Sequence, residues 1–319
     1  MPDTTRLSRR LFLGGCTGVG LLGVNSAVTR GGPAPGSQYL VRLGGPIHGR
    51  HENPEDCALE HVRLGYRAAY CPAASLGDPD RIRAISAAFN KQGVVIAEVG
   101  RWVNLVDADQ GKRLKNQKQV TDGLALAEAV GALCCVDIVG SYSPTSWMGP
   151  HPDNLSPRFF DEAVSNARSI IDAVKPSRAK FCYEMMGWSL PDSPESALKL
   201  LKAVDRKAFA IHLDPCNLIN SPLRFYRSND LLRECFEKLG PWIVSCHAKD
   251  LTWDVEMNIH FREVVPGRGS LDYRTYLSLL ASLPTRPPLM LEHLRTPQEY
   301  EEGRGYIRKV GAESGIKFE

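Results

Sequence analysis

The sequence predicts a single (β/α)8 barrel, an α/β fold in which eight parallel strands alternate with surrounding helices. Three observations predict it. Short runs rich in β-branched and aromatic residues recur along most of the chain. Amphipathic helical patterns separate these runs, and many begin with a capping residue followed by proline. Glycine ends several of the helical patterns just before the next strand-like run, and this alternation of strands and helices is typical of a TIM barrel. An open doubly wound sheet is the alternative, but no Gly-x-Gly-x-x-Gly motif follows the first strand.

The predicted strands follow one another at similar spacing. In chain order they are Tyr39–Leu43, Tyr66–Cys71, Val94–Val99, Leu133–Val139, Ala179–Met185, Phe209–Leu213, Ile243–His247 and Leu289–Glu292.

Helix ends are predicted from capping chemistry. A polar side chain can bind the unpaired amides of a first turn, and a proline there has no amide to leave unpaired. Five helices are therefore expected to begin at Asn53-Pro54, Asp78-Pro79, Ser156-Pro157, Ser193-Pro194 and Thr296-Pro297. Ser143-Pro144 and Ser221-Pro222 repeat the dipeptide without a clear helical pattern behind them. Helices are expected to end at Gly65, Gly93, Gly131 and Gly240, where a left-handed residue costs little.

The first residues predict an export signal. Ser8-Arg9-Arg10-Leu11-Phe12-Leu13 precedes a weakly apolar, glycine-rich run that ends in small residues. The paired arginines resemble a twin-arginine signal, which implies passage through the twin-arginine translocon and a periplasmic or other extracytoplasmic location. We expect residues 1–27 to be the signal, 28–37 a linker and 38–319 the barrel.

Composition narrows the class of protein. The 319 residues carry 39 Lys+Arg against 36 Asp+Glu, a formal charge of +3. Neither a strong basic excess nor a basic stripe is present, so nucleic-acid binding is not expected. No apolar run reaches the roughly 20 residues that span a bilayer. None of the nine cysteines forms a CxxC pair, which excludes a zinc ribbon. Assembly into a homo-oligomer remains open.

Four consecutive predicted strands end in a residue that can bind a metal: Glu184, Asp214, His247 and Glu292. Side chains alternate along a strand, and in each case the opposite face is more apolar and suits packing under the helices. The four are therefore expected inside the barrel at its carboxyl-terminal rim, where barrel enzymes work. Three carboxylates there would repel one another without a cation. An oxygen-rich set with one nitrogen favours Mn²⁺ or Mg²⁺, with Co²⁺ or Zn²⁺ as alternatives.

These four residues occur together with three further motifs: Leu213-Asp214-Pro215-Cys216-Asn217, His247-Ala248-Lys249-Asp250 and Val265-Pro266-Gly267-Arg268-Gly269. On this basis residues 38–315 resemble the xylose isomerase-like TIM-barrel superfamily of sugar isomerases and epimerases, which also contains endonuclease IV. The resemblance implies that the quartet holds the metal and that Glu184 and Glu292 flank the substrate as acid and base.

The sequence differs from two members of that superfamily at residues that their reactions use. Ketohexose 3-epimerases have a histidine at the position of Asn217 and a second glutamate at the position of Leu190. Endonuclease IV has an Asp-x-His pair after the seventh strand, whereas here the residue two positions after Asp254 is Glu256 and not histidine. A standard ketohexose epimerase and a DNA-repair enzyme are both disfavoured.

Other residues near the predicted rim are candidates for contact with a carbohydrate substrate. Glu98 and Asp137 end strands and suit either sugar hydroxyls or a structural ion pair, and His212 is expected beneath the metal. The further candidates are His48, Trp102, Trp188, Asn217, Lys249 and Arg268.

The predicted function is a divalent-metal-dependent sugar isomerase or epimerase that transfers a proton next to a carbonyl. Two alternatives stay open. One is a metal-dependent lyase, as in inosose dehydratases or elimination from a 3-keto glycoside. The other is an exported sugar-binding protein that keeps the metal and has no turnover.

Overall fold

The computed structural model describes residues 40–49 and 51–319. The predicted export signal and the predicted linker lie outside these residues.

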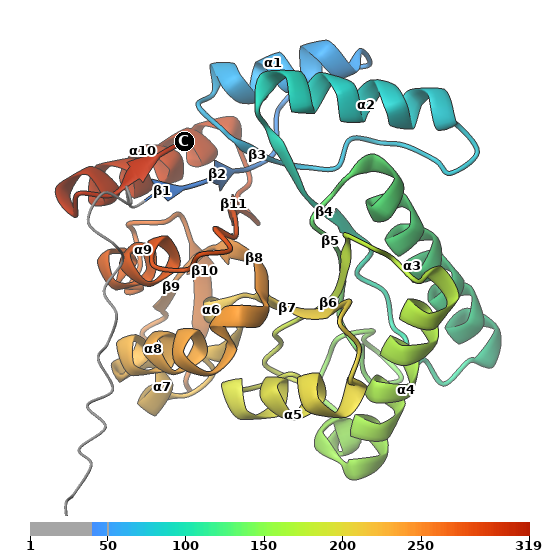
Figure 1. Cartoon of the computed structure of the whole chain (residues 1–319). Helices are drawn as coiled ribbons and strands as arrows, with labels where there is room; N and C mark the ends of the chain where they lie inside the picture. The colour runs from blue at the N-terminus through green and yellow to red at the C-terminus, as the bar shows by residue number, and fades with distance from the viewer. Residues whose placement is uncertain (1–39, 50) are drawn as a thin grey trace, which may run out of the picture. The chain divides into compact units, whose positions relative to one another are not determined.

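Eight parallel strands close into a barrel, as the sequence predicts (Figure 1). Around the barrel the order is β11-β2-β3-β4-β5-β6-β7-β8, so each strand lies beside its successor in the sequence and the last closes on the first. The barrel strands are β2 (Leu43–Gly44), β3 (Ala68–Tyr70), β4 (Val95–Gly100), β5 (Cys134–Asp137), β6 (Lys180–Glu184), β7 (Phe209–Leu213), β8 (Ile243–Ala248) and β11 (Leu289–Leu291).

Helices surround the barrel on its outside (Figure 1). The longer ones are α1 (Pro54–Arg63), α2 (Pro79–Gln92), α3 (Gln110–Val130), α4 (Pro157–Val174), α5 (Pro194–Val204), α8 (Ser228–Leu239), α9 (Tyr273–Ala281) and α10 (Pro297–Glu313). Short helical turns lie between them: η1 (Pro152–Leu155), α6 (Pro215–Leu218), α7 (Pro222–Tyr226) and η2 (Gly240–Trp242).

The five predicted cap-proline pairs all begin helices. In each, the side chain of the capping residue accepts a hydrogen bond from a backbone amide of the first turn. Such a cap stabilises a helix by about 1 kcal/mol. Ser221-Pro222 does the same at α7, so the absence of a helical pattern there was misleading.

The predicted helix-ending glycines divide into two kinds. Gly93 and Gly131 end α2 and α3 in the left-handed conformation, with φ of 64° and 83°. Gly65 has φ of 76° and directly follows the last residue of the α1 cap, Leu64. Gly240 also ends α8, as predicted, but its φ of −42° is right-handed instead of left-handed, because the 3₁₀ turn η2 begins at this residue.

The strands separate two apolar layers. Their outward faces, for example Phe181 and Tyr183 of β6, pack into the main core under the helices. Their inward faces carry smaller clusters, one of which contains Ala68 and Met290. Space is tight there, because a Cβ on Gly44 would lie 2.4 Å from the sulfur of Met290. Apolar side chains therefore fill the interior of the barrel, and the polar side chains of a site lie at its carboxyl-terminal end.

Two small sheets lie outside the barrel. β1 (Leu40–Val41) pairs in parallel with β12 (Lys317–Phe318). After β8 the chain forms an antiparallel hairpin of β9 (Asp250–Trp253) and β10 (Phe261–Val264), which the sequence analysis did not predict. None of the helices within the described residues is both long enough and apolar enough to cross a membrane.

Candidate metal centre

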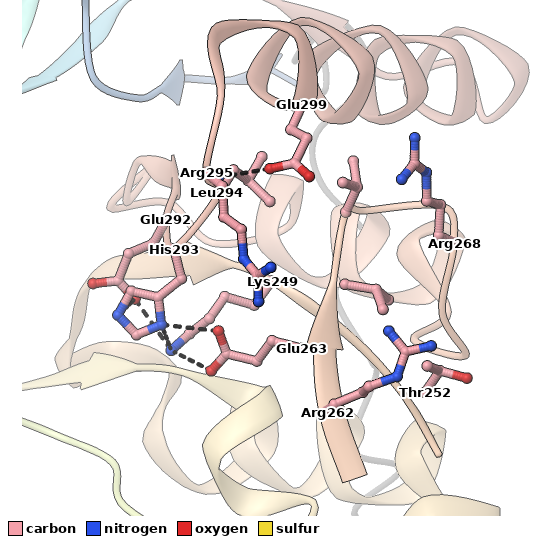
Figure 2. Close-up of a pocket in the computed structure, with 12 residues that line it drawn as sticks. Lys249, Thr252, Arg262, Glu263, Arg268, Glu292, His293, Leu294, Arg295 and Glu299 are labelled. Carbon is pink, nitrogen blue, oxygen red and sulfur yellow. Dashed lines mark hydrogen bonds and ion pairs between the residues drawn. The ribbon is translucent and has the colours of Figure 1, made fainter. Parts of the chain in front are cut away.

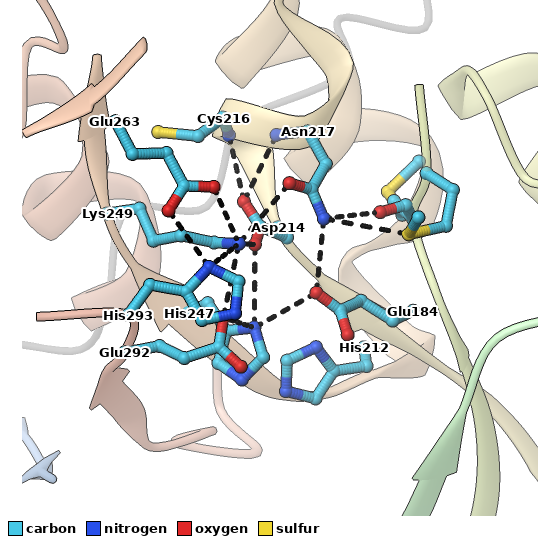
Figure 3. A network of polar contacts seen from close by, with 12 residues as sticks. Glu184, His212, Asp214, Cys216, Asn217, His247, Lys249, Glu263, Glu292 and His293 are labelled. Atoms are coloured by element: carbon cyan, nitrogen blue, oxygen red, sulfur yellow. Dashed lines mark hydrogen bonds and ion pairs between the residues drawn. The ribbon is translucent and has the colours of Figure 1, made fainter. Parts of the chain in front are cut away.

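The four side chains predicted as metal ligands converge at the carboxyl ends of four neighbouring strands (Figure 3). Glu184 ends β6, Asp214 follows β7, His247 lies in β8 and Glu292 follows β11. The Nδ1 atom of His247 is at the centre of the group. It lies 3.1 Å from one carboxylate oxygen each of Glu184 and Glu292, and 3.4 Å from Asp214 Oδ2.

The chemistry of this donor set fits a divalent cation. Each of the four residues offers one oxygen or nitrogen atom, and these atoms all lie within 4.8 Å of one another. Asp214 Oδ2 and Glu292 Oε2 are buried, and each faces Lys249 Nζ and His247 Nδ1 in an ion pair. Both oxygens thus lie where positive charge is needed, which suits them to a metal. Three carboxylates and one imidazole match a divalent metal ion.

The charges of the cluster control the protonation of its histidine. Burial disfavours the imidazolium, but the carboxylates of Glu292 and Glu184 outweigh burial and raise the pKa of His247 well above its usual value. Burial also disfavours the Asp214 carboxylate, yet Lys249 and His247 hold its pKa low. In the absence of a metal, a proton on His247 therefore neutralises part of the carboxylate charge.

A second buried group lies beneath the cluster. His212 Nε2 is 2.8 Å from Glu98 Oε2, and His247 Nε2 is 3.6 Å from Glu98 Oε1. Burial opposes the Glu98 carboxylate, but the two histidines lower its pKa to about 2. Glu98 is fully buried, and its two carboxylate oxygens face the two imidazole rings. The carboxylate orients the imidazole of His247 so that Nδ1 faces the other three residues.

Trp102 fixes the far oxygen of Glu184. Its indole Nε1 donates a hydrogen bond of 2.6 Å to Glu184 Oε2, and its ring stacks on His247 with centroids 6.4 Å apart. The backbone of Trp102 is left-handed, with φ of 30°. A Cβ on Gly100 would lie only 1.8 Å from the indole, so glycine is needed for this close approach. One oxygen of Glu184 thus faces the cluster while the other is held by the indole.

Asp137 anchors the loop that carries Trp102. Its Oδ1 accepts a 2.7 Å hydrogen bond from the backbone amide of Val103, the next residue along. Its other oxygen is buried without a hydrogen-bond partner among the described residues. Burial raises the pKa of Asp137 well above its usual value. This side chain supports the cluster through the loop and does not contact it.

Lys249 and Asn217 complete the polar surround of the cluster. Lys249 Nζ lies 2.7 Å from Asp214 Oδ2 and 3.1 Å from Glu292 Oε2. Asn217 Nδ2 donates to Glu184 Oε1 at 3.1 Å and to the carbonyl oxygen of Met185 at 3.0 Å. The strand alternation that points His247 inward also points Lys249 inward, two residues later.

A cavity of about 1320 Å³ opens above the cluster. Its lining includes Glu184, Glu292 and Lys249 of the polar surround, and also Trp102 and Trp188. The cluster is therefore open to a ligand on the side away from the barrel floor.

The chain matches the model of a protein family described as a xylose isomerase-like TIM barrel over residues 60–310, which is most of its length. It belongs to this family. No protein of established function matches it closely enough in sequence to be counted as a relative.

Solved structures with this fold are similar over most of their length. A 3-keto-D-glucoside 4-epimerase from E. coli has 15% identity and a TM-score of 0.61, covering 84% of this chain and 99% of its own. A xylose isomerase-like TIM-barrel protein from Mycobacterium smegmatis, solved in complex with magnesium, has 17% identity and a TM-score of 0.62, covering 88% and 100%. A probable 3-DHS dehydratase from Bacillus anthracis has 16% identity and a TM-score of 0.62, covering 85% and 98%. These identities establish a shared fold.

Two polar residues of this xylose isomerase-like barrel lie at the cluster although the sequence analysis did not single them out. His293 Nδ1 is 2.9 Å from Glu263 Oε2, and Lys249 Nζ is 3.4 Å from Glu263 Oε1 (Figures 2 and 3). His293 directly follows Glu292, a position that could have drawn attention to it. Glu263 belongs to the hairpin strand β10, and an expectation of that hairpin would have been needed to find it.

Two predicted substrate-binding residues line other hollows than the cavity above the cluster. Arg268 lines a hollow of about 660 Å³ that also reaches Glu292 and Lys249 (Figure 2). Its guanidinium forms a 2.5 Å ion pair with Glu302. His48 lines a third hollow, where its ring lies 5.3 Å from that of Tyr300.

Proposed function

We propose that this protein is a divalent-metal-dependent isomerase or epimerase that transfers a proton at the carbon beside a carbonyl of a sugar or sugar-like polyol. The observation that carries the proposal is the placement of two carboxylates. Glu184 and Glu292 approach the same nitrogen of His247 to 3.1 Å from β6 and β11, on either side of β7 and β8. Two carboxylates that face one ligand from different sides can remove a proton and return one elsewhere.

A divalent cation in this site would supply Lewis-acid stabilisation of negative charge on a substrate oxygen. Glu184 is oriented for its role by Trp102, since the indole holds one oxygen while the other faces the cavity and the cluster. Glu292 contacts Lys249, whose ammonium offers a second positive group near a developing negative charge. Asn217 supplies an amide at the same wall of the cavity.

Elimination is the second candidate, because it shares the first proton abstraction and differs only in the fate of a neighbouring leaving group. The similarity in fold to a probable 3-DHS dehydratase supports elimination as the second candidate reaction. The same residues would act, with one glutamate taking the proton and the other assisting the leaving oxygen.

Solvent exchange tests the proposal. Mn²⁺-loaded protein is incubated with a set of keto-sugars in D₂O, and proton NMR follows deuterium at the carbon beside the carbonyl. We expect incorporation by the wild type. Glu184→Gln and Glu292→Gln should lose about 100-fold or more in kcat, since each removes a proton-transfer group.

The matched control is Glu234→Gln, because among the described residues Glu234 forms an ion pair only with Lys238, one turn further along α8. This variant should keep wild-type exchange. Metal content of every variant is measured by elemental analysis, so that loss of metal is distinguished from loss of proton transfer. Turnover without exchange, together with active Gln variants, would contradict the proposal and favour a hydride shift. Metal and sugar binding without turnover would favour a binding protein.

We also propose that the protein is exported through the twin-arginine route, on the basis of Arg9 and Arg10 and the run that follows them.

A further inference from the structure

We propose that the substrate is not a free monosaccharide but a sugar joined through a glycosidic bond to a second, flat and largely apolar group. This inference rests on the proposed function for the sugar end and adds the class of group attached to it. Four features of the cavity above the cluster support it: its size, the division of its lining, the exposure of its aromatic side chains and the support behind one of its walls.

The cavity is larger than a single sugar ring needs. Its volume is about 1320 Å³, whereas sites for drug-sized ligands measure about 300–1,000 Å³. A monosaccharide is smaller than such ligands. If its carbonyl lay at the cluster, most of the cavity would remain for whatever the sugar carries.

The lining of the cavity is divided by polarity. Side chains that form hydrogen bonds or ion pairs gather at the cluster, with Glu184, Lys249 and Glu292 among them. The rest of the lining is more apolar than polar, and Trp147, Trp188 and Phe261 supply its large apolar faces. Its polar members are Ser146, Asn220, Ser221 and His260. A flat, largely apolar group would cover the aromatic faces, whereas the hydroxyl groups of a second sugar would lose water against them. The lining therefore favours a ligand with one polar end and one largely apolar end.

The apolar side chains of this wall are exposed to solvent. Trp188 is 61% exposed, Ile259 is 62% exposed and Trp147 is 42% exposed. Trp147 and Trp188 lie in the loops after β5 and β6, and Ile259 lies in the connection between β9 and β10. Three separate segments therefore contribute to one cavity wall. Contiguous exposed apolar side chains at the mouth of a site are typical of ligand-binding grooves. Indole rings offer flat faces on which an aromatic group can stack.

One part of the wall is supported from behind. Phe261 of β10 stacks on Phe225 of α7, with ring centroids 5.2 Å apart and an interplanar angle of 12°. Trp253 of β9 meets the same Phe225 edge-on at 5.7 Å. The hairpin is thus packed against α7 by aromatic contacts, which holds Phe261 at the cavity before any ligand enters. A preformed wall lowers the cost of ordering on binding.

Paired glycosides test the inference. Titration calorimetry on Mn²⁺-loaded protein compares a set of 4-nitrophenyl glycosides of common hexoses and pentoses with the corresponding methyl glycosides. Within each pair only the aglycone differs. We expect at least one 4-nitrophenyl glycoside to bind tenfold or more tightly than its methyl partner. Trp188→Ala should weaken that binding about fivefold to tenfold and change methyl glycoside binding less than twofold.

A second cavity variant and a distant control complete the design. Trp147→Ala should weaken aryl glycoside binding in the same selective way. Trp242→Ala is the matched control, because Trp242 is 40% exposed and lies in η2, just before the amino end of β8 and so at the opposite end of the barrel. It should change neither affinity.

Each outcome decides the inference. It is overturned if no aryl glycoside in the set binds, if none binds more tightly than its methyl partner, or if Trp188→Ala and Trp147→Ala leave the difference intact. The readout is binding and does not require turnover. Selective, tryptophan-dependent aryl binding without deuterium exchange would therefore refute the proposed reaction and leave this inference standing. Exchange with free keto-sugars and no aryl preference would refute this inference alone.

Discussion

At the scale of single residues, the cluster is built around one nitrogen atom, His247 Nδ1. Three carboxylate oxygens surround it within 3.4 Å, and Glu98 faces the other nitrogen of the same ring. Such an imidazole is either protonated or bound to a cation, because a neutral nitrogen would leave the carboxylate repulsion uncompensated. Protons and metal ions therefore compete directly for this position.

We predict that metal binding releases a proton. In the metal-free protein the carboxylates of Glu292 and Glu184 raise the pKa of His247 well above its usual value, so they favour the protonated ring. A metal ligand must be neutral imidazole, so Mn²⁺ must displace that proton. Affinity for Mn²⁺ should accordingly fall as the pH is lowered from 8 to 6.

Calorimetric titration of Mn²⁺ in two buffers of different ionisation enthalpy measures the protons released. We expect about one proton per Mn²⁺ from this histidine. His260→Gln, a change at an exposed histidine of the hairpin loop, should leave the number unchanged. Binding that is independent of buffer and of pH would show that His247 is not the ligand.

The sequence located the four converging residues because strand alternation and strand ends are short-range patterns. Lys249 and Asn217 could be proposed for the same reason, since each lies within three residues of a quartet member. The contact between Trp102 and Glu184 could not be foreseen. It depends on a left-handed backbone at Trp102 and on the missing Cβ of Gly100, and both are properties of the folded loop.

At the scale of elements, strands and helices were predictable where local chemistry decides them. The eight barrel strands are buried runs, and the five cap-proline pairs carry their signal within two residues. The hairpin β9–β10 was missed because its strands are partly exposed and its connection, residues 254–260, contains no glycine to mark a turn. The hairpin supplies Glu263 and Phe261, so its absence also hid part of the site.

Two glycines provide a clean test of helix-end chemistry. Gly93 has φ of 64° and Gly305 lies inside α10, and in both cases a Cβ would meet nothing within 4 Å. The methyl group of an alanine would therefore not clash with a neighbouring residue at either position, and only the backbone conformation differs. We predict that Gly93→Ala lowers the free energy of unfolding by about 1 kcal/mol, because alanine is disfavoured in the left-handed region.

The matched change, Gly305→Ala, should raise the free energy of unfolding by about 0.5–1 kcal/mol, because alanine is favoured over glycine inside a helix. Urea unfolding followed by circular dichroism measures both. Equal effects of the two substitutions, or stabilisation by Gly93→Ala, would show that backbone conformation does not control these positions.

At the scale of the whole molecule, the sequence predicts that the protein is exported from the cytoplasm. Arg9 and Arg10 precede Leu11-Phe12-Leu13 and a glycine-rich apolar run. The twin-arginine route carries proteins that have already folded. We predict that replacing both arginines by lysine leaves the full-length protein in the cytoplasm, as fractionation and immunoblotting would show.

The control replaces Arg6 by lysine, which keeps the pair intact and should preserve export. Mass spectrometry of the exported wild type should find a first residue near position 28. Export of the double-lysine variant at the wild-type level would refute the twin-arginine prediction.

The parallel pairing of β1 with β12 joins the two ends of the described barrel. Leu40 lies opposite Lys317 and Val41 opposite Phe318, so the strands run about 4.8 Å apart. The barrel is therefore a closed ring of eight strand–helix units, and the same ring could form from a chain that begins at a different unit. A short linker from residue 318 to residue 40 would allow the chain to be opened elsewhere as a circular permutant. The connections at the amino-terminal ends of the strands are the places for such a cut, because they lie at the opposite end of the barrel from Glu184, Asp214, His247 and Glu292.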